Sequence, residues 1–205
     1  MRGVGLLITA LALPLPLLFG SFGKALAYDG SRAALYADIY WNAYNTSFPS
    51  YADDCTNFVS QAMSYGGDQQ ENLNYLPQDD WAWYMYFDLD WNHTNSWTVA
   101  GDNWQWLYNS GRAYLVASYS GAQYTSNHTG AYAGDEIYYA WYYHRNPPDA
   151  GIKHMSIQVN DGYDERGNWT SIVDSHTTNR YHVNWTLFSY NQYANTTQIY
   201  VTHHT

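Results

Sequence analysis

The sequence predicts an α+β fold, in which helices come first and an antiparallel sheet follows. Three observations carry this prediction: apolar residues at helical spacing in the first half, a change to short strand patterns from Ala113 onward, and turn residues between the segments. Runs of helices followed by runs of strands are typical of α+β proteins. The chain contains no internal repeat or Pro/Ser-rich linker that would indicate a second domain.

Residues 1–27 have the pattern of a signal peptide. Arg2 supplies an early positive charge, residues 6–22 are an apolar run broken by proline and glycine, and Ala25-Leu26-Ala27 is a small-residue cleavage site. The breaks disfavour a membrane span, and an uncleaved N-terminal anchor is the alternative. We therefore expect a secreted, monomeric domain of residues 28–205 that makes no membrane contact once the signal peptide is removed.

Two helices are expected on either side of the single cysteine, at Ser31–Tyr44, with Ser31 as its cap, and at Ala100–Gly111. Their expected inward residues are Ala34, Leu35, Ile39 and Trp41 in the first helix and Trp104, Leu107 and Tyr108 in the second. The stretch of residues 68–97 has no clear period and predicts an ordered loop, and long ordered loops are often functional.

Cys55 is expected at the start of a third helix, which ends at Gly66-Gly67. The residues that follow Cys55 on one helix face are Phe58, Val59, Ala62 and Met63. A thiol at a helix N-terminus experiences a partial positive charge, which lowers its pKa and favours the thiolate. A cysteine without a disulfide partner is either a nucleophile or a small buried hydrophobe, and its position alone leaves both readings open.

The second half of the chain predicts an antiparallel sheet. The expected strands are Gly134–Trp141, His154–Val159, Ser171–His176 and Gln198–Thr202. In the second of these, Met155, Ile157 and Val159 share one face and His154, Ser156 and Gln158 share the other. Asn160-Asp161-Gly162 is a hairpin signal that should pair the second and third strands. His203-His204 is expected at a frayed terminus.

This pattern suggests the parts of a cysteine hydrolase, which needs a thiolate, a base and a group that orients the base. His154 is the candidate base, because it opens a strand on its polar side and an imidazole exchanges protons near neutral pH. The hairpin should bring Asp174 or His176 beside it as the orienting group. These two residues share one strand face, so periodicity does not choose between them.

Composition and motifs exclude other classes. The formal net charge of −10 leaves no basic stripe for nucleic acid. We find no metal-binding motif and no phosphate-binding loop, so no metal and no cofactor are expected. With 23 Tyr and 10 Trp, the chain has many residues that could hold a sugar or a peptide.

The segment Asp54-Cys55-Thr56-Asn57-Phe58-Val59-Ser60-Gln61 closely resembles the signature of the putative amidase domain family, relatives of the NlpC/P60 and CHAP cell-wall hydrolases. Further similar segments follow in order, at 96–99, 133–137, 153–159 and 174–179. The resemblance implies a papain-like core, with the nucleophile on a helix packed against an antiparallel sheet. It also implies Cys55 as nucleophile, His154 as base and His176 as third member.

Two functions are compatible with these observations. The first is a secreted cysteine amidase or endopeptidase that cleaves peptide-type amide bonds, with peptidoglycan peptides as substrate. Its oxyanion would be stabilised by the Cys55 backbone N–H and by a second donor. The alternative is a non-catalytic module on the same fold, which binds glycan or peptide through its Tyr/Trp-rich surface.

Overall fold

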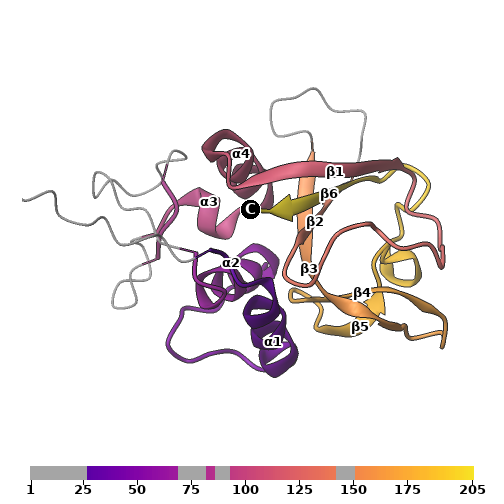
Figure 1. Ribbon diagram of the computed structural model, residues 1–205, viewed down its shortest axis with the longest axis horizontal. Helices are drawn as coiled ribbons and strands as arrows, with labels where there is room; N and C mark the ends of the chain where they lie inside the picture. The colour runs from indigo at the N-terminus through magenta and orange to yellow at the C-terminus, as the bar shows by residue number, and fades with distance from the viewer. Residues whose placement is uncertain (1–26, 69–81, 86–92, 142–150) are drawn as a thin grey trace, which may run out of the picture.

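The structure, a computed structural model, describes residues 27–68, 82–85, 93–141 and 151–205 (Figure 1). Nearly all of the predicted signal peptide, and much of the loop expected over residues 68–97, lie outside the described residues. In the part of the chain that the structure describes, no helix has the length and apolar character needed to cross a membrane.

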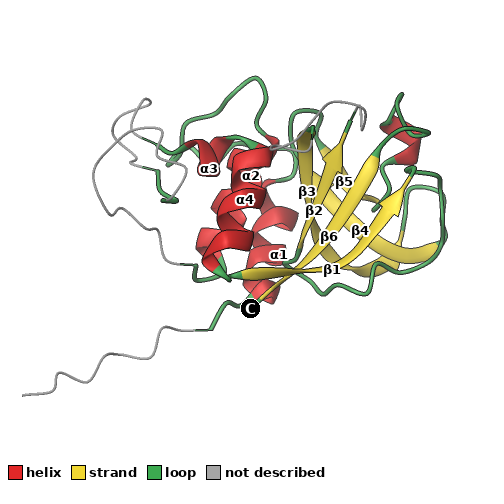
Figure 2. Ribbon diagram, turned by 90° about the horizontal axis from the view of Figure 1, so that it is seen from above, coloured by secondary structure: helices red, strands yellow, loops and turns green. Residues whose placement is uncertain are grey.

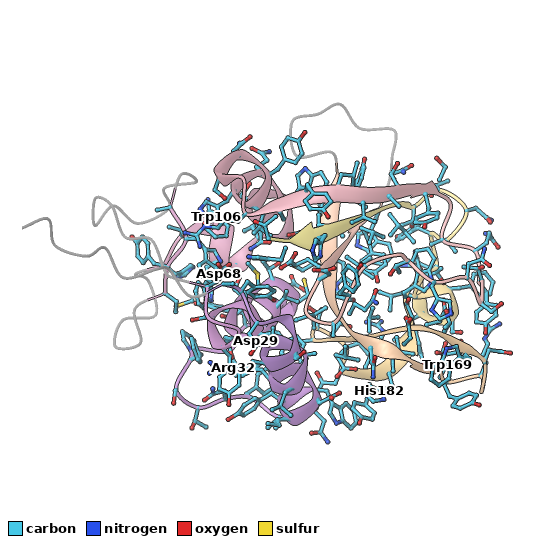
Figure 3. The ribbon with its side chains drawn as sticks, viewed as in Figure 1. Asp29, Arg32, Asp68, Trp106, Trp169 and His182 are labelled. Atoms are coloured by element: carbon cyan, nitrogen blue, oxygen red, sulfur yellow. The ribbon has the colours of Figure 1, made fainter. Side chains whose placement is uncertain are left out.

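The described segments contain four α-helices, all of which precede the sheet in the chain. They are α1 (Gly30–Tyr40), α2 (Cys55–Tyr65), α3 (Asn95–Thr98) and α4 (Ala100–Ser110). Helix α1 is capped by Asp29 instead of Ser31, because the Asp29 carboxylate accepts a 3.2 Å hydrogen bond from the Arg32 N–H (Figure 3). Helix α2 ends at Gly66, and α4 ends at Gly111 in a left-handed conformation, as the glycines predicted.

Six strands form one antiparallel sheet. They are β1 (Ala113–Ser120), β2 (Glu136–Ala140), β3 (Ile152–Tyr163), β4 (Trp169–Ser175), β5 (Arg180–Asn184) and β6 (Gln198–His204). Their order in space is β1-β6-β2-β3-β4-β5, so the last strand of the chain lies between β1 and β2. The helices gather at one side of this sheet (Figure 2). The predicted α+β class is therefore confirmed.

Helix α2 is the most deeply buried helix in the described part of the chain, since every residue from Cys55 to Met63 is buried. Its predicted apolar face packs in the core that the helices form with β3, and its polar residues are also enclosed. The Asn57 amide donates to the Pro49 carbonyl at 2.8 Å and accepts from the Trp97 indole at 2.9 Å. The Ser60 hydroxyl donates to the Trp97 carbonyl at 2.9 Å. These bonds satisfy groups that would otherwise destabilise a buried helix.

Two predicted helix faces are wrong in part. In α1, Ala34 is buried as predicted, but Leu35 and Ile39 are about half exposed, and the other buried positions are Ala33, Tyr36 and Ala37. Small residues allow α1 to approach α2 and β3 closely, which is why alanines occupy this contact. In α4, Trp106 is buried whereas Tyr108 is 59% exposed.

The strand ends also differ from the prediction. β3 continues through Asn160-Asp161-Gly162, and the turn lies at residues 164–168. There the Asp164 carboxylate accepts 2.9 Å hydrogen bonds from the backbone N–H groups of Arg166 and Asn168, and this holds the turn.

His204 does not lie at a frayed end. Its ring contacts the carboxylates of Glu136 and Asp68 at 2.8 and 2.9 Å. Burial alone would lower the pKa of His204, but these two carboxylates raise it to about 10. The imidazolium therefore ties the end of β6 to β2 and to the segment after α2.

Candidate active site

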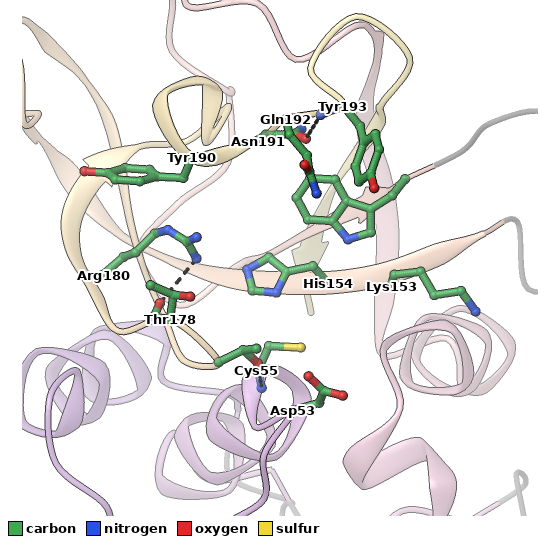
Figure 4. Close-up of a pocket in the computed structure, with 12 residues that line it drawn as sticks. Asp53, Cys55, Lys153, His154, Thr178, Arg180, Tyr190, Asn191, Gln192 and Tyr193 are labelled. Carbon is green, nitrogen blue, oxygen red and sulfur yellow. Dashed lines mark hydrogen bonds between the residues drawn. The ribbon is translucent and has the colours of Figure 1, made fainter.

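The structure brings Cys55 and His154 together in the lining of one pocket of about 380 Å³ (Figure 4). Cys55 begins α2, and His154 lies near the start of β3. Further lining residues are Trp141, Thr177, Arg180, Tyr190 and Tyr193. Asp174 and His176, the other two candidates, are not among the lining residues.

Thr177 holds the backbone of Cys55. The Cys55 N–H donates a 3.1 Å hydrogen bond to the Thr177 hydroxyl oxygen. Thr177 has a φ of 80°, a conformation that β-branched residues rarely adopt and that costs about 1–3 kcal/mol. The N–H that we expected to face an oxyanion is thus already hydrogen-bonded in this structure.

Burial decides the charge of the thiol. It raises the pKa of Cys55 above its ordinary value, although hydrogen bonds from the Met155 backbone and from the Thr56 and Thr177 hydroxyls act in the opposite direction. The predicted lowering of this pKa by the helix N-terminus is therefore wrong. A helix end contributes about 0.3–1 kcal/mol at an exposed site, whereas full burial shifts a pKa by up to about 3–5 units.

His154 is neutral for the same reason. Burial, together with the positive charge of Arg180, lowers the pKa of His154 to about 3. The ring lies 5.6 Å from the Tyr139 ring and 5.8 Å from the Trp141 ring, centre to centre. Its Nε2 has no hydrogen-bond partner among the described residues. The pocket therefore holds an uncharged thiol beside an uncharged imidazole that has a free nitrogen.

His176 has a different position from the one predicted. Its Nδ1 lies 2.8 Å from the Asp54 carboxylate, and its Nε2 lies 2.8 Å from the Tyr40 carbonyl oxygen. The ring also stacks on Phe58 at 4.0 Å. Because a carbonyl only accepts hydrogen bonds, Nε2 carries a hydrogen. Both nitrogens are occupied, so His176 does not orient His154 and instead fixes the residue before Cys55.

Asp174 also lies away from His154, because the register of β3 and β4 pairs it with Ile157. His176 lies just beyond the end of β4, and both residues are near α1, Asp174 with an oxygen within 4.8 Å of the Asp38 carboxylate and His176 at the Tyr40 carbonyl. The Asp174 carboxylate accepts a 2.7 Å hydrogen bond from the His182 N–H, and its Oδ2 has no partner among the described residues. The prediction that Asp174 or His176 lies beside His154 is wrong in this register.

One group of described residues, Asp38, Asp174 and His182, has its potential ligand atoms within 4.8 Å of one another and could hold a metal ion. The geometry also has a simpler account. Burial and the nearby Asp38 carboxylate raise the pKa of Asp174 to about 8, so the two acids can share a proton. His182, labelled in Figure 3, contacts Asp38 at 2.8 Å.

Sequence reasoning missed Arg180, Thr177 and Trp141. Trp141 ended a predicted strand, but nothing in its pattern related it to His154. Thr177 belongs to a segment that already resembled the family, and Arg180 follows that segment directly. The signal that could have found Arg180 is the scarcity of cations, because Lys and Arg together supply 8 of 205 residues.

The fold and the pocket define an α+β protein in which a thiol and an imidazole line the same pocket. The chain belongs to the family described as "Putative amidase domain", whose model matches residues 27–202. Membership in this family suggests amide hydrolysis.

A curated relative, "Uncharacterized protein YhbB" of Bacillus subtilis (strain 168), is 36% identical over 90 residues. Those residues are 44% of this chain and 27% of that protein, so the match spans about a quarter of the relative's length. No solved structure matches the chain. The papain-like core and the relation to NlpC/P60 and CHAP hydrolases therefore stay predictions.

The state of the thiol can be tested by alkylation. We expect the rate of iodoacetamide reaction at Cys55 in the folded protein to rise steadily between pH 6 and 10, because a raised pKa leaves little thiolate at neutral pH. Glutathione serves as the free-thiol control. A plateau already reached below pH 6 would show a thiolate–imidazolium pair and contradict the neutral pair.

Replacement of His176 tests its structural role. We expect His176→Ala to lower the free energy of unfolding by about 3–5 kcal/mol, because it leaves the buried Asp54 carboxylate without its partner. His128→Ala is the matched control, since it breaks an exposed His–Asp pair and should cost less than about 1 kcal/mol. Urea denaturation measures both. An unchanged stability with a large loss of turnover would return His176 to a catalytic role.

Asp174→Asn should change the pH dependence of stability. Because the pKa of Asp174 is raised in the folded state, folding favours the protonated carboxyl group. Protonated Asp174 therefore stabilises the fold fully below about pH 4, and this contribution disappears as the pH rises through about 8. The melting temperature of the variant relative to wild type should therefore increase from pH 5 to pH 9. Asp38→Asn should reduce the same dependence. A constant difference across this range would contradict the shared proton.

Proposed function

We propose that this chain is a secreted cysteine amidase or endopeptidase that hydrolyses peptide-type amide bonds in peptidoglycan. The observation that carries this proposal is the shared pocket of Cys55 and His154, in a protein of an amidase family. Export rests on the signal-peptide pattern of residues 1–27. Peptidoglycan peptides fit an exported amidase, because they present amide bonds outside the cell.

The pocket supports a general-base form of cysteine catalysis. Neutral His154 accepts the thiol proton as the Cys55 sulfur attacks the amide carbon, and the imidazolium then gives that proton to the leaving amine. The product of this half-reaction is a thioester on Cys55. In the second half, His154 takes a proton from water, the hydroxide oxygen attacks the thioester carbon, and the acid leaves as the thiol is restored.

The tetrahedral intermediate needs donors for its oxyanion. The Cys55 N–H remains a candidate, provided that the substrate displaces the Thr177 hydroxyl from it. We assign Thr177 as the residue that keeps this N–H in place before substrate binds. Its hydroxyl is held against the Cys55 backbone, and its own backbone has a φ of 80°.

A second function has one specific observation in its favour. Tyr163 and Trp169, 67% and 54% exposed, form an edge-to-face pair next to the turn of the β3–β4 hairpin. Exposed aromatic pairs of this kind can hold a sugar or a peptide. If binding were the whole function, hydrolysis would be absent, and ligand binding would depend on Trp169 and not on Cys55.

Loss of either pocket residue should abolish hydrolysis. We expect Cys55→Ala and His154→Gln each to eliminate turnover of peptidoglycan peptides, and the double variant to be no worse than either one, because members of one catalytic unit are not additive. Mass spectrometry of released fragments measures turnover, and circular dichroism confirms the fold. Turnover retained by well-folded Cys55→Ala would end the cysteine proposal. A loss of only a few-fold in His154→Gln would require another base.

A further inference from the structure

The pocket is positively charged in a protein that is negatively charged overall. The chain carries a formal net charge of −10. Among the described residues that line the pocket, however, Lys153 and Arg180 are the cations and Asp53 is the acid. Figure 4 shows Asp53 on the opposite side of Cys55 from Arg180. The excess positive charge is therefore placed on the side of the pocket where Arg180 lies.

Arg180 is half-buried, and no carboxylate neutralises it within the described part of the chain. Its guanidinium makes two long contacts, 3.3 Å to the Thr178 carbonyl and 3.5 Å to the Ser175 hydroxyl. Its Nε is buried and has no hydrogen-bond partner among the described residues. The group lies 4.9 Å over the ring of Tyr190. Most of its five N–H donors are thus uncommitted.

The guanidinium lies within electrostatic reach of both reacting groups. Its charge contributes to the lowered pKa of His154, and Cys55 acts on the pKa of Arg180 in turn. Figure 4 shows it directed toward the His154 ring, above the Cys55 backbone. A ligand group bound to Arg180 would consequently place the neighbouring bonds of the ligand next to the Cys55 thiol.

A planar, unpaired guanidinium in a partly dehydrated pocket is complementary to a carboxylate, which can accept two parallel hydrogen bonds from it. We infer that Arg180 binds a free carboxylate of the substrate, so that the scissile amide is one flanked by a carboxylate-bearing residue. The statement about the scissile amide rests on the proposed function. Binding of a carboxylate by Arg180 does not depend on hydrolysis. Arg180 is then the specificity-determining residue.

Hydrolysis tests the inference with matched substrates. The substrates are stem peptides released from peptidoglycan, either intact or with their carboxylates converted to carboxamides. For the intact peptides we expect Arg180→Gln to raise KM about 10–100-fold, the loss for one charge-assisted contact, and Arg180→Lys to recover part of it. For the carboxamides, KM should hardly change. Arg166→Gln removes one positive charge outside the pocket lining and is the matched control.

Other outcomes would overturn the inference. Equal losses on both substrates in Arg180→Gln would show a structural or general electrostatic role. If kcat fell equally for both and KM were unchanged, Arg180 would act on the thiol or the oxyanion instead. Circular dichroism of Arg180→Gln and Arg180→Lys establishes that each variant is folded before the comparison is made.

Calorimetry separates this inference from the proposed function. Cys55→Ala protein is titrated with the intact and the carboxamide peptides, with and without Arg180→Gln. Selective binding of the intact peptide that depends on Arg180 supports the inference even if the wild type hydrolyses nothing. Hydrolysis of both peptides without any dependence on Arg180 overturns the inference and leaves the cysteine amidase proposal standing.

Discussion

The buried contact of His176 with Asp54 and Tyr40 is the constraint on which the site depends. It joins the end of α1, the residue before α2 and the segment after β4 through two contacts of 2.8 Å. Asp54 also accepts hydrogen bonds from the Tyr51 N–H and the Asn57 amide. Because Cys55 follows Asp54 directly, fixing Asp54 fixes the thiol relative to the sheet. Removing one partner of such a buried pair strongly destabilises a protein, because the other partner stays buried without a counter-group. This favours a single arrangement of these elements.

Exclusion of water explains the electrostatics of the pocket. Burial raises the pKa of Cys55 and lowers that of His154, so both groups are uncharged. A solvent-exposed thiol and imidazole could instead exchange a proton and form a charged pair. Hydrogen bonds from Met155, Thr56 and Thr177 favour the thiolate but do not outweigh the cost of burial. Arg180 adds a fixed positive charge that disfavours the imidazolium and favours an anion. Such a pocket keeps the His154 imidazole uncharged and favours the binding of negatively charged groups.

The segment that resembles the family is largely a structural segment. Asp54, Asn57, Ser60 and Gln61 each form buried hydrogen bonds that hold α2 against its neighbours. Only Cys55 of this segment combines a reactive atom with a place in the pocket. The same holds for the later His-Thr segment, in which His176 supports the scaffold and Thr177 contacts the backbone of Cys55. Most residues of such a motif therefore indicate the fold. One or two of them indicate the chemistry.

The sequence by itself determined the α+β class, the start and end of α2 and the pairing of β3 with β4, and it selected Cys55 and His154 as candidates, which the structure places in one pocket lining. Periodicity and glycine stops are local properties, which is why they could be read without the fold. The tertiary structure decided the position of β6 between β1 and β2, the burial of His204, the partners of His176 and Asp174, and the entry of Arg180 into the pocket. These depend on strand register and on contacts between residues far apart in the chain. The β3–β4 and β4–β5 pairings each contain a register shift at a bulge, and no local pattern encodes such a shift.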